Sequence, residues 1–125
     1  MSCFSRAYAE SGTVLFDRAR AQLLAAQNAK SPQAKHKTYL RAASELKEFL
    51  ERHPHHSSAA TARFNVGSIY EDFAMTTGDR DDATRALHYF REMVRFSPKD
   101  SLADDALYEV GVVCEKVYQD TRCRD

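Results

Sequence analysis

The chain has 125 residues, a length typical of one domain, and its 18 basic and 18 acidic residues cancel. Nucleic acids and anionic membranes bind proteins through basic patches, so this balance argues against both as main partners. No apolar run approaches the roughly 20 residues that span a bilayer. With only 4 Gly and 3 Pro, the composition favours a single all-α domain over residues 1–125.

The first part of the chain predicts an amphipathic helix over residues 1–28, interrupted near Ser11-Gly12. Apolar side chains recur there at spacings of three and four residues, which places them on one face of a helix. Residues 28–37 are polar and include Pro32, so we expect a loop before the next helix.

A second helix is expected from about Lys37 to Arg52. It must end near His53, because Pro54 disfavours helical geometry in the residue before it. Ser57 is then expected to cap a third helix whose apolar residues cover more than one face. Such a pattern is typical of a helix packed between two neighbours.

The third helix is expected to end in a turn at residues 76–79, where Gly78 favours a helix end. Asp81 or Asp82 is expected to cap the fourth helix, since a carboxylate also suits the positive end of the helix dipole. This fourth helix should end at Ser97-Pro98.

Ser101 is expected to cap a fifth helix that runs to about Gln119. This helix carries an apolar face with no later helix to cover it, so either the protein continues or the face contacts another chain; we favour continuation. Cys114 lies on its inward side and is expected to be a buried thiol. Together with Cys3 and Cys123 it makes an odd number of cysteines without metal-ligand spacing, which leaves the redox compartment open.

Between Ala42 and Cys114, one helical motif occurs twice at a spacing of 44 residues. Apolar and small positions are kept in the two copies, while polar positions drift. A period in this range indicates stacked helical units. The matching pairs include Pro54 with Pro98, Ser57 with Ser101, Ala62 with Ala106, Phe64 with Tyr108, Gly67 with Gly111, and Leu46 with Phe90.

The motif resembles the tetratricopeptide repeat, whose first helix reads large-x2-large-Gly-x2-Tyr and whose second carries Ala-x3-Phe followed by Pro. The resemblance implies a right-handed superhelix of antiparallel helix hairpins, about five helices, in units of approximately 4–54, 57–98 and an incomplete 101–120. A small residue lets paired helices approach closely, and an aromatic ring fills the space between repeats. The positions that define the repeat are Ala42, Leu46, Pro54, Gly67, Tyr70, Ala86, Phe90, Pro98 and Gly111.

The spacing of 44 exceeds the roughly 34 residues of a typical repeat. Most of the excess lies between Gly67 and Ala86. We therefore expect either a protruding hairpin at residues 75–82 or helices that are longer by a turn or two.

Two segments, residues 54–73 and 96–108, resemble an envelope group of tetratricopeptide proteins from Gram-negative bacteria. The shared pattern is a proline and a short polar link, then Ser101-x-Ala-Asp-Asp-Ala-Leu-Tyr and a glycine. The group includes the Tol-Pal coordinator, BamD-type outer-membrane assembly lipoproteins, and the N-terminal domains of some cell-wall N-acetylmuramoyl-L-alanine amidases. The Leu40-Arg41-Ala42-Ala43 segment and the long repeat look most like the amidase domain, which precedes a zinc hydrolase.

This resemblance implies a periplasmic or envelope location and a docking role, with a cytoplasmic location as the alternative. A freestanding adaptor of the Tol-Pal coordinator or BamD type is the rival interpretation. The partner is expected to be a protein or peptide of the envelope, with a contact through the exposed apolar face of the last helix. Nothing matches the zinc site of the hydrolase, so we expect no catalytic residue and no cofactor in this chain.

The residues expected to meet a partner are polar side chains of the first helix of each unit, which lines the concave face of stacked hairpins. They are Arg63, Asn65, Glu109 and Glu115, which we expect to face solvent.

A histidine cluster, His53, His55 and His56, offers the weaker alternative of a small metal-dependent enzyme, with His36 or His88 as a further zinc or copper ligand. The second copy of the motif has no ligand residues at the matching positions. We therefore expect loop histidines exposed to solvent and no metal site.

Overall fold

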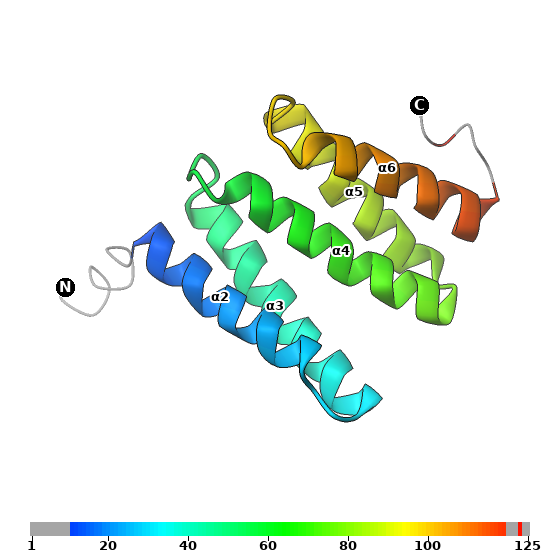
Figure 1. Cartoon of the computed structure of the whole chain (residues 1–125), viewed down its shortest axis with the longest axis horizontal. Helices are drawn as coiled ribbons and strands as arrows, with labels where there is room; N and C mark the ends of the chain where they lie inside the picture. Colours follow the sequence, from blue (N-terminus) through cyan, green and yellow to red (C-terminus); the bar gives the residue numbers. More distant parts are fainter. Residues whose placement is uncertain (1–10, 120–122, 124–125) are drawn as a thin grey trace. The chain divides into compact units, whose positions relative to one another are not determined.

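The computed structural model describes residues 11–119 and Cys123. These residues form five α-helices, α2 to α6, and one π-helical turn, η1, without a β-strand among them (Figure 1). The all-α prediction is confirmed. None of the described helices has the length and apolarity needed to cross a membrane. The helix expected over residues 1–10 lies outside the described residues.

Two compact units make up the chain, one ending at Ala59 and the other beginning at Ala60. The first contains helices α2 and α3, and the second contains α4, α5, α6 and η1. The single domain over residues 1–125 and the superhelical stacking of three hairpins stay predictions.

The first unit is a hairpin of α2 (Gly12–Gln27) and α3 (Pro32–Arg52). The link between them is short, so the two helices run antiparallel and cover each other's apolar faces (Figure 1). The core is contributed about equally by both helices. It consists of Leu15, Phe16, Ala19 and Ala26 from α2, and Ala42, Ala43, Leu46 and Phe49 from α3.

The start of α3 corrects the sequence prediction, which placed residues 28–37 in a loop. The helix begins at Pro32, where a missing N–H costs nothing because the first turn leaves its N–H groups unbonded anyway. The Ser31 hydroxyl accepts a hydrogen bond from the backbone N–H of Ala34 at 3.1 Å and caps the helix. The helix ends at Arg52, as Pro54 predicts.

The second unit contains α4 (Ala59–Thr77), α5 (Arg80–Phe96), α6 (Ala103–Val113) and η1 (Cys114–Tyr118). Gly78 follows α4 with a φ of 74° and donates its N–H to Ala74 O, so the predicted helix end is confirmed. Only residues 78–79 separate α4 from α5. The extra residues of the long repeat therefore lengthen the helices rather than forming a protruding loop.

Three predicted helix caps are wrong by one to three residues. Helix α4 begins two residues after Ser57. Asp79, rather than Asp81 or Asp82, caps α5, and its Oδ1 accepts from Asp81 N at 2.8 Å. Leu102, rather than Ser101, precedes α6 without a side-chain cap, and the nearby Asp100 Oδ1 accepts from Leu102 N.

Candidate functional site

Helices α4 and α5 of the second unit approach closely where Gly67 of α4 faces the ring of Phe90 of α5. A Cβ added at Gly67 would lie 2.8 to 3.0 Å from three ring carbons of Phe90, closer than real Cβ contacts. The Phe90 side chain is fully buried, and its ring meets that of Phe64 edge-on at 5.5 Å. Two of the predicted repeat-defining residues, Gly67 and Phe90, thus lie against each other.

The other repeat-defining residues lie mainly in the interior of their own units. Ala42 and Leu46 are buried in the first unit, while Pro54 is exposed in the turn after α3. In the second unit, the ring of Tyr70 stacks on that of Tyr89 at 6.3 Å. Ala86 and Gly111 are buried, and Pro98 is exposed.

Arginine side chains of the second unit lie over aromatic rings. The guanidinium of Arg63 is 4.7 Å from the centre of the Phe96 ring, and that of Arg85 is 5.8 Å from the Tyr70 ring. Burial lowers the pKa of Arg63, an effect opposed by the nearby negative charge of Glu92. Only 9% of Arg63 is exposed, so the expectation that this residue faces solvent is wrong.

The remaining residues of the predicted partner-binding face are more accessible. Asn65 and Glu109 are half-buried, and Glu115 is exposed on η1. The sequence analysis missed the packing of Arg63 against Phe96 because arginine is a charged residue. The repeat motif has a large apolar residue at position 63. That match to a buried position is the signal that could have predicted the burial of Arg63.

Two glutamates of the second unit approach each other from different helices, Glu71 from α4 and Glu109 from α6. Burial raises the pKa of Glu71 to about 9, and the hydrogen bond with the Glu109 carboxyl and the charges of Glu109 and Asp72 add to the effect. Glu71 Oε2 is buried and has no hydrogen-bond partner among the described residues. Glu71 therefore holds its proton more strongly than an isolated carboxyl group does, because its pKa is raised.

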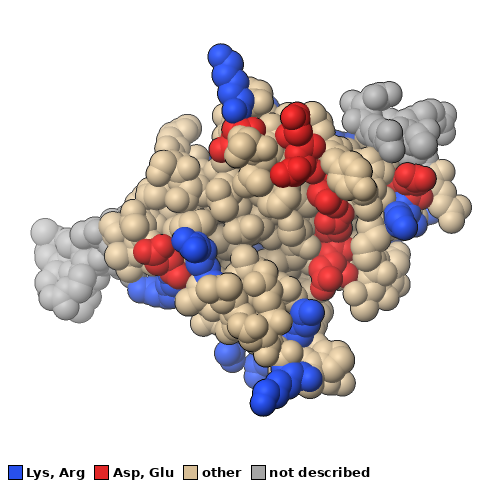
Figure 2. Space-filling model, viewed as in Figure 1, with Lys and Arg blue, Asp and Glu red and all other residues tan. Residues whose placement is uncertain are grey.

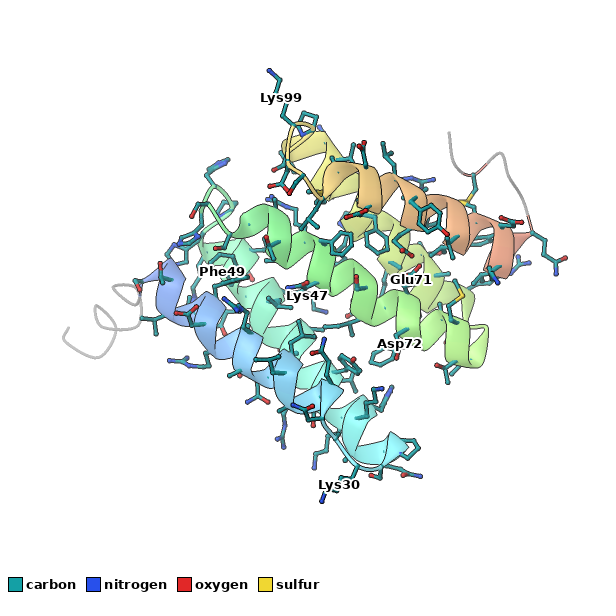
Figure 3. All side chains as sticks on the ribbon, viewed as in Figure 1. Lys30, Lys47, Phe49, Glu71, Asp72 and Lys99 are labelled. Atoms are coloured by element: carbon teal, nitrogen blue, oxygen red, sulfur yellow. A yellow bond between two sulfur atoms is a disulfide. The ribbon has the colours of Figure 1, made fainter. Side chains whose placement is uncertain are left out.

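Acidic side chains also gather on the surface over the same two helices. Figure 2 shows acidic side chains gathered in a band that crosses α6 and α4. Glu71 and Asp72 project from α4 in this region (Figure 3). Such a face repels anionic ligands. Sequence reasoning missed Glu71, although it is the counterpart of Glu115 in the second copy of the motif.

Replacing Glu71 by glutamine is expected to reduce the loss of stability that the protein undergoes as pH rises. The folded chain keeps a proton on Glu71 that the unfolded chain releases near the ordinary carboxyl pKa of 4.5. The contribution of this group to the free energy of unfolding therefore falls as pH rises from about 4.5 through about 9. Urea unfolding at about pH 5, 7 and 9 measures the difference between wild type and variant.

Glu51→Gln is the matched control, because Glu51 is exposed on α3 and carries the same carboxyl group. Its pH profile should follow that of the wild type. Parallel profiles for wild type and Glu71→Gln would contradict the raised pKa of Glu71.

The histidine cluster lies at the end of α3 in the first unit. The rings of His53 and His56 pack against the ring of Phe49, which is labelled in Figure 3. Their centres lie 6.0 and 5.2 Å from the centre of the Phe49 ring. His56 Nδ1 accepts from Ser58 N at 3.0 Å, which leaves the proton on Nε2 to be donated to Thr13 Oγ1 at 3.2 Å. Both nitrogens of His56 are thus engaged in holding the turn against the start of α2.

The expectation that these histidines are exposed to solvent is correct only for His55. His53 and His56 are half-buried, and a Cβ added at Gly12 would lie 2.6 Å from His56 Cδ2. Glycine at the start of α2 thus leaves room for the imidazole. Within residues 11–119 and Cys123, no three His, Cys, Asp or Glu side chains come together in a way that suits a metal ion.

Cys114 is buried, as predicted. It forms a disulfide with Cys123, so the prediction that it is a free thiol is wrong. The bond joins residues nine positions apart, one at the start of η1 and one beyond its end. The sequence alone did not predict this pairing, because three cysteines allow three different disulfides and one cysteine is always left over. Cys3 itself lies outside the described residues.

No known protein family, no curated protein and no solved structure matches this chain. The function proposed below therefore depends on the residues of this chain alone.

Proposed function

We propose that this chain is a non-catalytic scaffold of the tetratricopeptide type that binds a protein or peptide partner. The observation that carries the proposal is the contact of Gly67 with the Phe90 ring. It joins α4 and α5 at the two positions where the repeat motif demands a small residue and an aromatic one. Two half-buried polar residues, Asn65 of α4 and Glu109 of α6, are the proposed partner-binding positions.

The cell envelope is the proposed location. The Cys114–Cys123 disulfide supports it, because disulfides persist in oxidising compartments such as the bacterial periplasm and are rare in the cytosol. The resemblance of residues 54–73 and 96–108 to envelope tetratricopeptide proteins points the same way. Within that group, we propose a docking domain that positions a cell-wall amidase on an envelope partner.

Photo-crosslinking tests the partner-binding face. A photoreactive residue at position 65 or 109 is expected to crosslink one specific protein in an envelope extract. A photoreactive residue in place of Lys99, which is exposed in the α5–α6 link, serves as the matched control. It should not crosslink that protein. The captured protein is then purified, and Asn65→Arg and Glu109→Arg are expected to weaken its binding to the chain. Equal capture from position 99, or unchanged affinity of both variants, would contradict the proposed face.

Two rival functions have separate tests. The coding sequence that follows this chain in the gene distinguishes an amidase, where a zinc hydrolase comes next, from a freestanding adaptor. A small metal-dependent enzyme is tested by incubating the chain with peptidoglycan and zinc. We expect no turnover. Turnover that disappears in a His53→Ala, His55→Ala or His56→Ala variant would contradict the scaffold proposal and favour a metal-dependent enzyme.

A further inference from the structure

Helix α6 presents two large apolar side chains to solvent. Leu107 is 52% exposed and Tyr108 is 70% exposed. Asp104 and Asp105 lie about one turn before them and are also exposed. Residues three and four apart are neighbours on a helix surface, so each apolar side chain has a carboxylate beside it. We name these four residues the α6 outer face.

The first copy of the repeat motif shows what covers the corresponding face of α4. Positions 63 and 64 match positions 107 and 108. Arg63 is only 9% exposed, because its guanidinium lies over the Phe96 ring of α5. Phe64 is half-buried, and its ring meets the Phe90 ring of α5 edge-on. The face of α4 is thus covered by a helix that presents aromatic rings.

The α6 outer face has no such cover among the described residues, as the exposure of its side chains shows. The open stretch ends before Gly111 and Cys114, which are buried. Neighbouring large apolar side chains that stay exposed are typical of an interaction surface. The comparison with α4 indicates that a helix fits this surface, with an apolar side chain placed against Leu107 and Tyr108.

The charge of the surface selects the kind of helix. Neither Asp104 nor Asp105 forms an ion pair with a described residue. The acidic band of Figure 2 continues from α6 over α4, where Glu71 and Asp72 lie (Figure 3). A partner that carries Lys or Arg is therefore attracted, and one that carries Asp or Glu is repelled.

The Tyr108 ring adds a preference for arginine over lysine. A guanidinium packs on the face of an aromatic ring, and its planar fork also matches a carboxylate. The second unit already contains this contact, because the guanidinium of Arg85 lies 5.8 Å from the centre of the Tyr70 ring. Asp104 and Asp105 are four and three positions before Tyr108, so one arginine of a partner can contact the ring and a carboxylate together.

We propose that the α6 outer face binds a basic amphipathic helix of a partner protein. The apolar side of that helix packs against Leu107 and Tyr108, and its arginines meet Asp104 and Asp105. This inference rests on the proposed scaffold function and gives the chemistry of its partner. The proposed binding position Glu109 directly follows Tyr108, so both belong to the same turn of α6.

A designed peptide tests the surface. The probe is a helical peptide of about 18 residues, about five turns, with leucine on one side and arginine elsewhere. The control peptide has glutamate in place of every arginine. Fluorescence anisotropy is expected to detect binding of the Leu/Arg peptide alone, and this binding should weaken at higher salt because exposed charges are screened. Equal affinity of both peptides would overturn the choice of a basic partner.

Substitutions show where the peptide binds. Tyr108→Ala is expected to raise the Kd of the Leu/Arg peptide about tenfold. Replacing both Asp104 and Asp105 by asparagine is expected to raise it about threefold to tenfold. Leu40→Ala and Glu51→Gln are the matched controls, because both positions are exposed on α3 of the first unit. They should leave the Kd unchanged. Equal losses in the controls, or none in the α6 variants, would overturn the proposal.

Competition separates this inference from the proposed function. The protein captured from position 65 or 109 is incubated with the chain and an excess of the Leu/Arg peptide, and its crosslinking is expected to disappear. Crosslinking that persists would leave the scaffold function intact and overturn the basic helix as the partner. If neither position captures a protein while Tyr108→Ala still weakens peptide binding, the scaffold function fails and the α6 outer face is supported.

A second copy of the chain is the other occupant that the test distinguishes. Sedimentation velocity of the chain without peptide is expected to show no self-association that depends on Tyr108. Dimers that form in the wild type and are absent from Tyr108→Ala would assign the α6 outer face to a second copy and overturn the proposal.

Discussion

Replacing Phe90 by alanine is expected to lower the free energy of unfolding by about 3–5 kcal/mol. The Phe90 side chain is fully buried in the second unit, and it contacts Gly67 and Phe64 of α4. Truncation to alanine removes this apolar surface from the core and leaves a cavity between α4 and α5. Urea unfolding followed by far-ultraviolet circular dichroism measures the change. Tyr108→Ala is the control, because Tyr108 is aromatic but 70% exposed, and it should cost no more than about 0.5 kcal/mol.

A second substitution tests whether α4 and α5 pack closely at Phe90, because close packing and simple loss of apolar area predict different signs for the change in the free energy of unfolding. Gly67→Ala would normally stabilise a helix by about 0.5–1 kcal/mol. Here we expect destabilisation instead, since the new methyl group meets the Phe90 ring. In a Phe90→Leu background the same change should become neutral or stabilising, with a coupling energy of about 0.5–3 kcal/mol. Stabilisation by Gly67→Ala in the wild-type chain would argue against the close approach of α4 and α5.

The corresponding prediction for the first unit concerns Phe49. Its side chain is fully buried, and its ring lies 5.4 Å from that of Phe16 and 5.2 Å from that of His56. We expect Phe49→Ala to cost about 3–5 kcal/mol, because it empties the core of the hairpin and removes the surface on which the histidine rings rest. Urea unfolding monitored by amide signals of α2 and α3 in nuclear magnetic resonance measures the loss within this unit.

Leu40→Ala provides the control in the same helix, since Leu40 is 46% exposed. It should change the free energy of unfolding by no more than about 0.5 kcal/mol. Similar losses for Phe49→Ala and Leu40→Ala would show that the side of α3 carrying Phe49 does not form the core.

The helices could be predicted because the spacing of apolar residues along the chain indicates them. Apolar residues at intervals of three and four identify the buried side of a helix, and the second copy of the motif confirms which positions are kept. The end of α3 before Pro54 and the end of α4 at Gly78 follow from backbone chemistry at single residues. These features depend on residues that are close together in the chain, so they can be predicted from the sequence.

Helix starts were predicted less well, because several polar residues compete for each cap. At α5, Asp79, Asp81 and Asp82 all have suitable side chains, and the turn after Gly78 decides in favour of Asp79. At α6, Asp100 bonds to Leu102 N and leaves Ser101 without a capping role. The choice depends on the path of the preceding backbone.

The candidate site was predicted only in part, because its properties arise from contacts between helices. The raised pKa of Glu71 needs Glu109 from another helix, and the burial of Arg63 needs the Phe96 ring from α5. The Cys114–Cys123 bond joins η1 to a residue beyond Gln119, which has a left-handed backbone conformation. None of these pairings has a periodicity that a single sequence displays.

The shortness of the links has a consequence for how the chain reaches its folded state. Residues 28–31 join α2 to α3, residues 78–79 join α4 to α5, and residues 97–102 join α5 to α6. Native contacts thus form mostly between segments that are close in sequence, and little chain entropy is lost in closing each loop. Helical domains of such low contact order fold within microseconds to milliseconds. Oxidation of the cysteines takes seconds or longer, so the helices assemble first and the covalent bond is added to an already folded second unit.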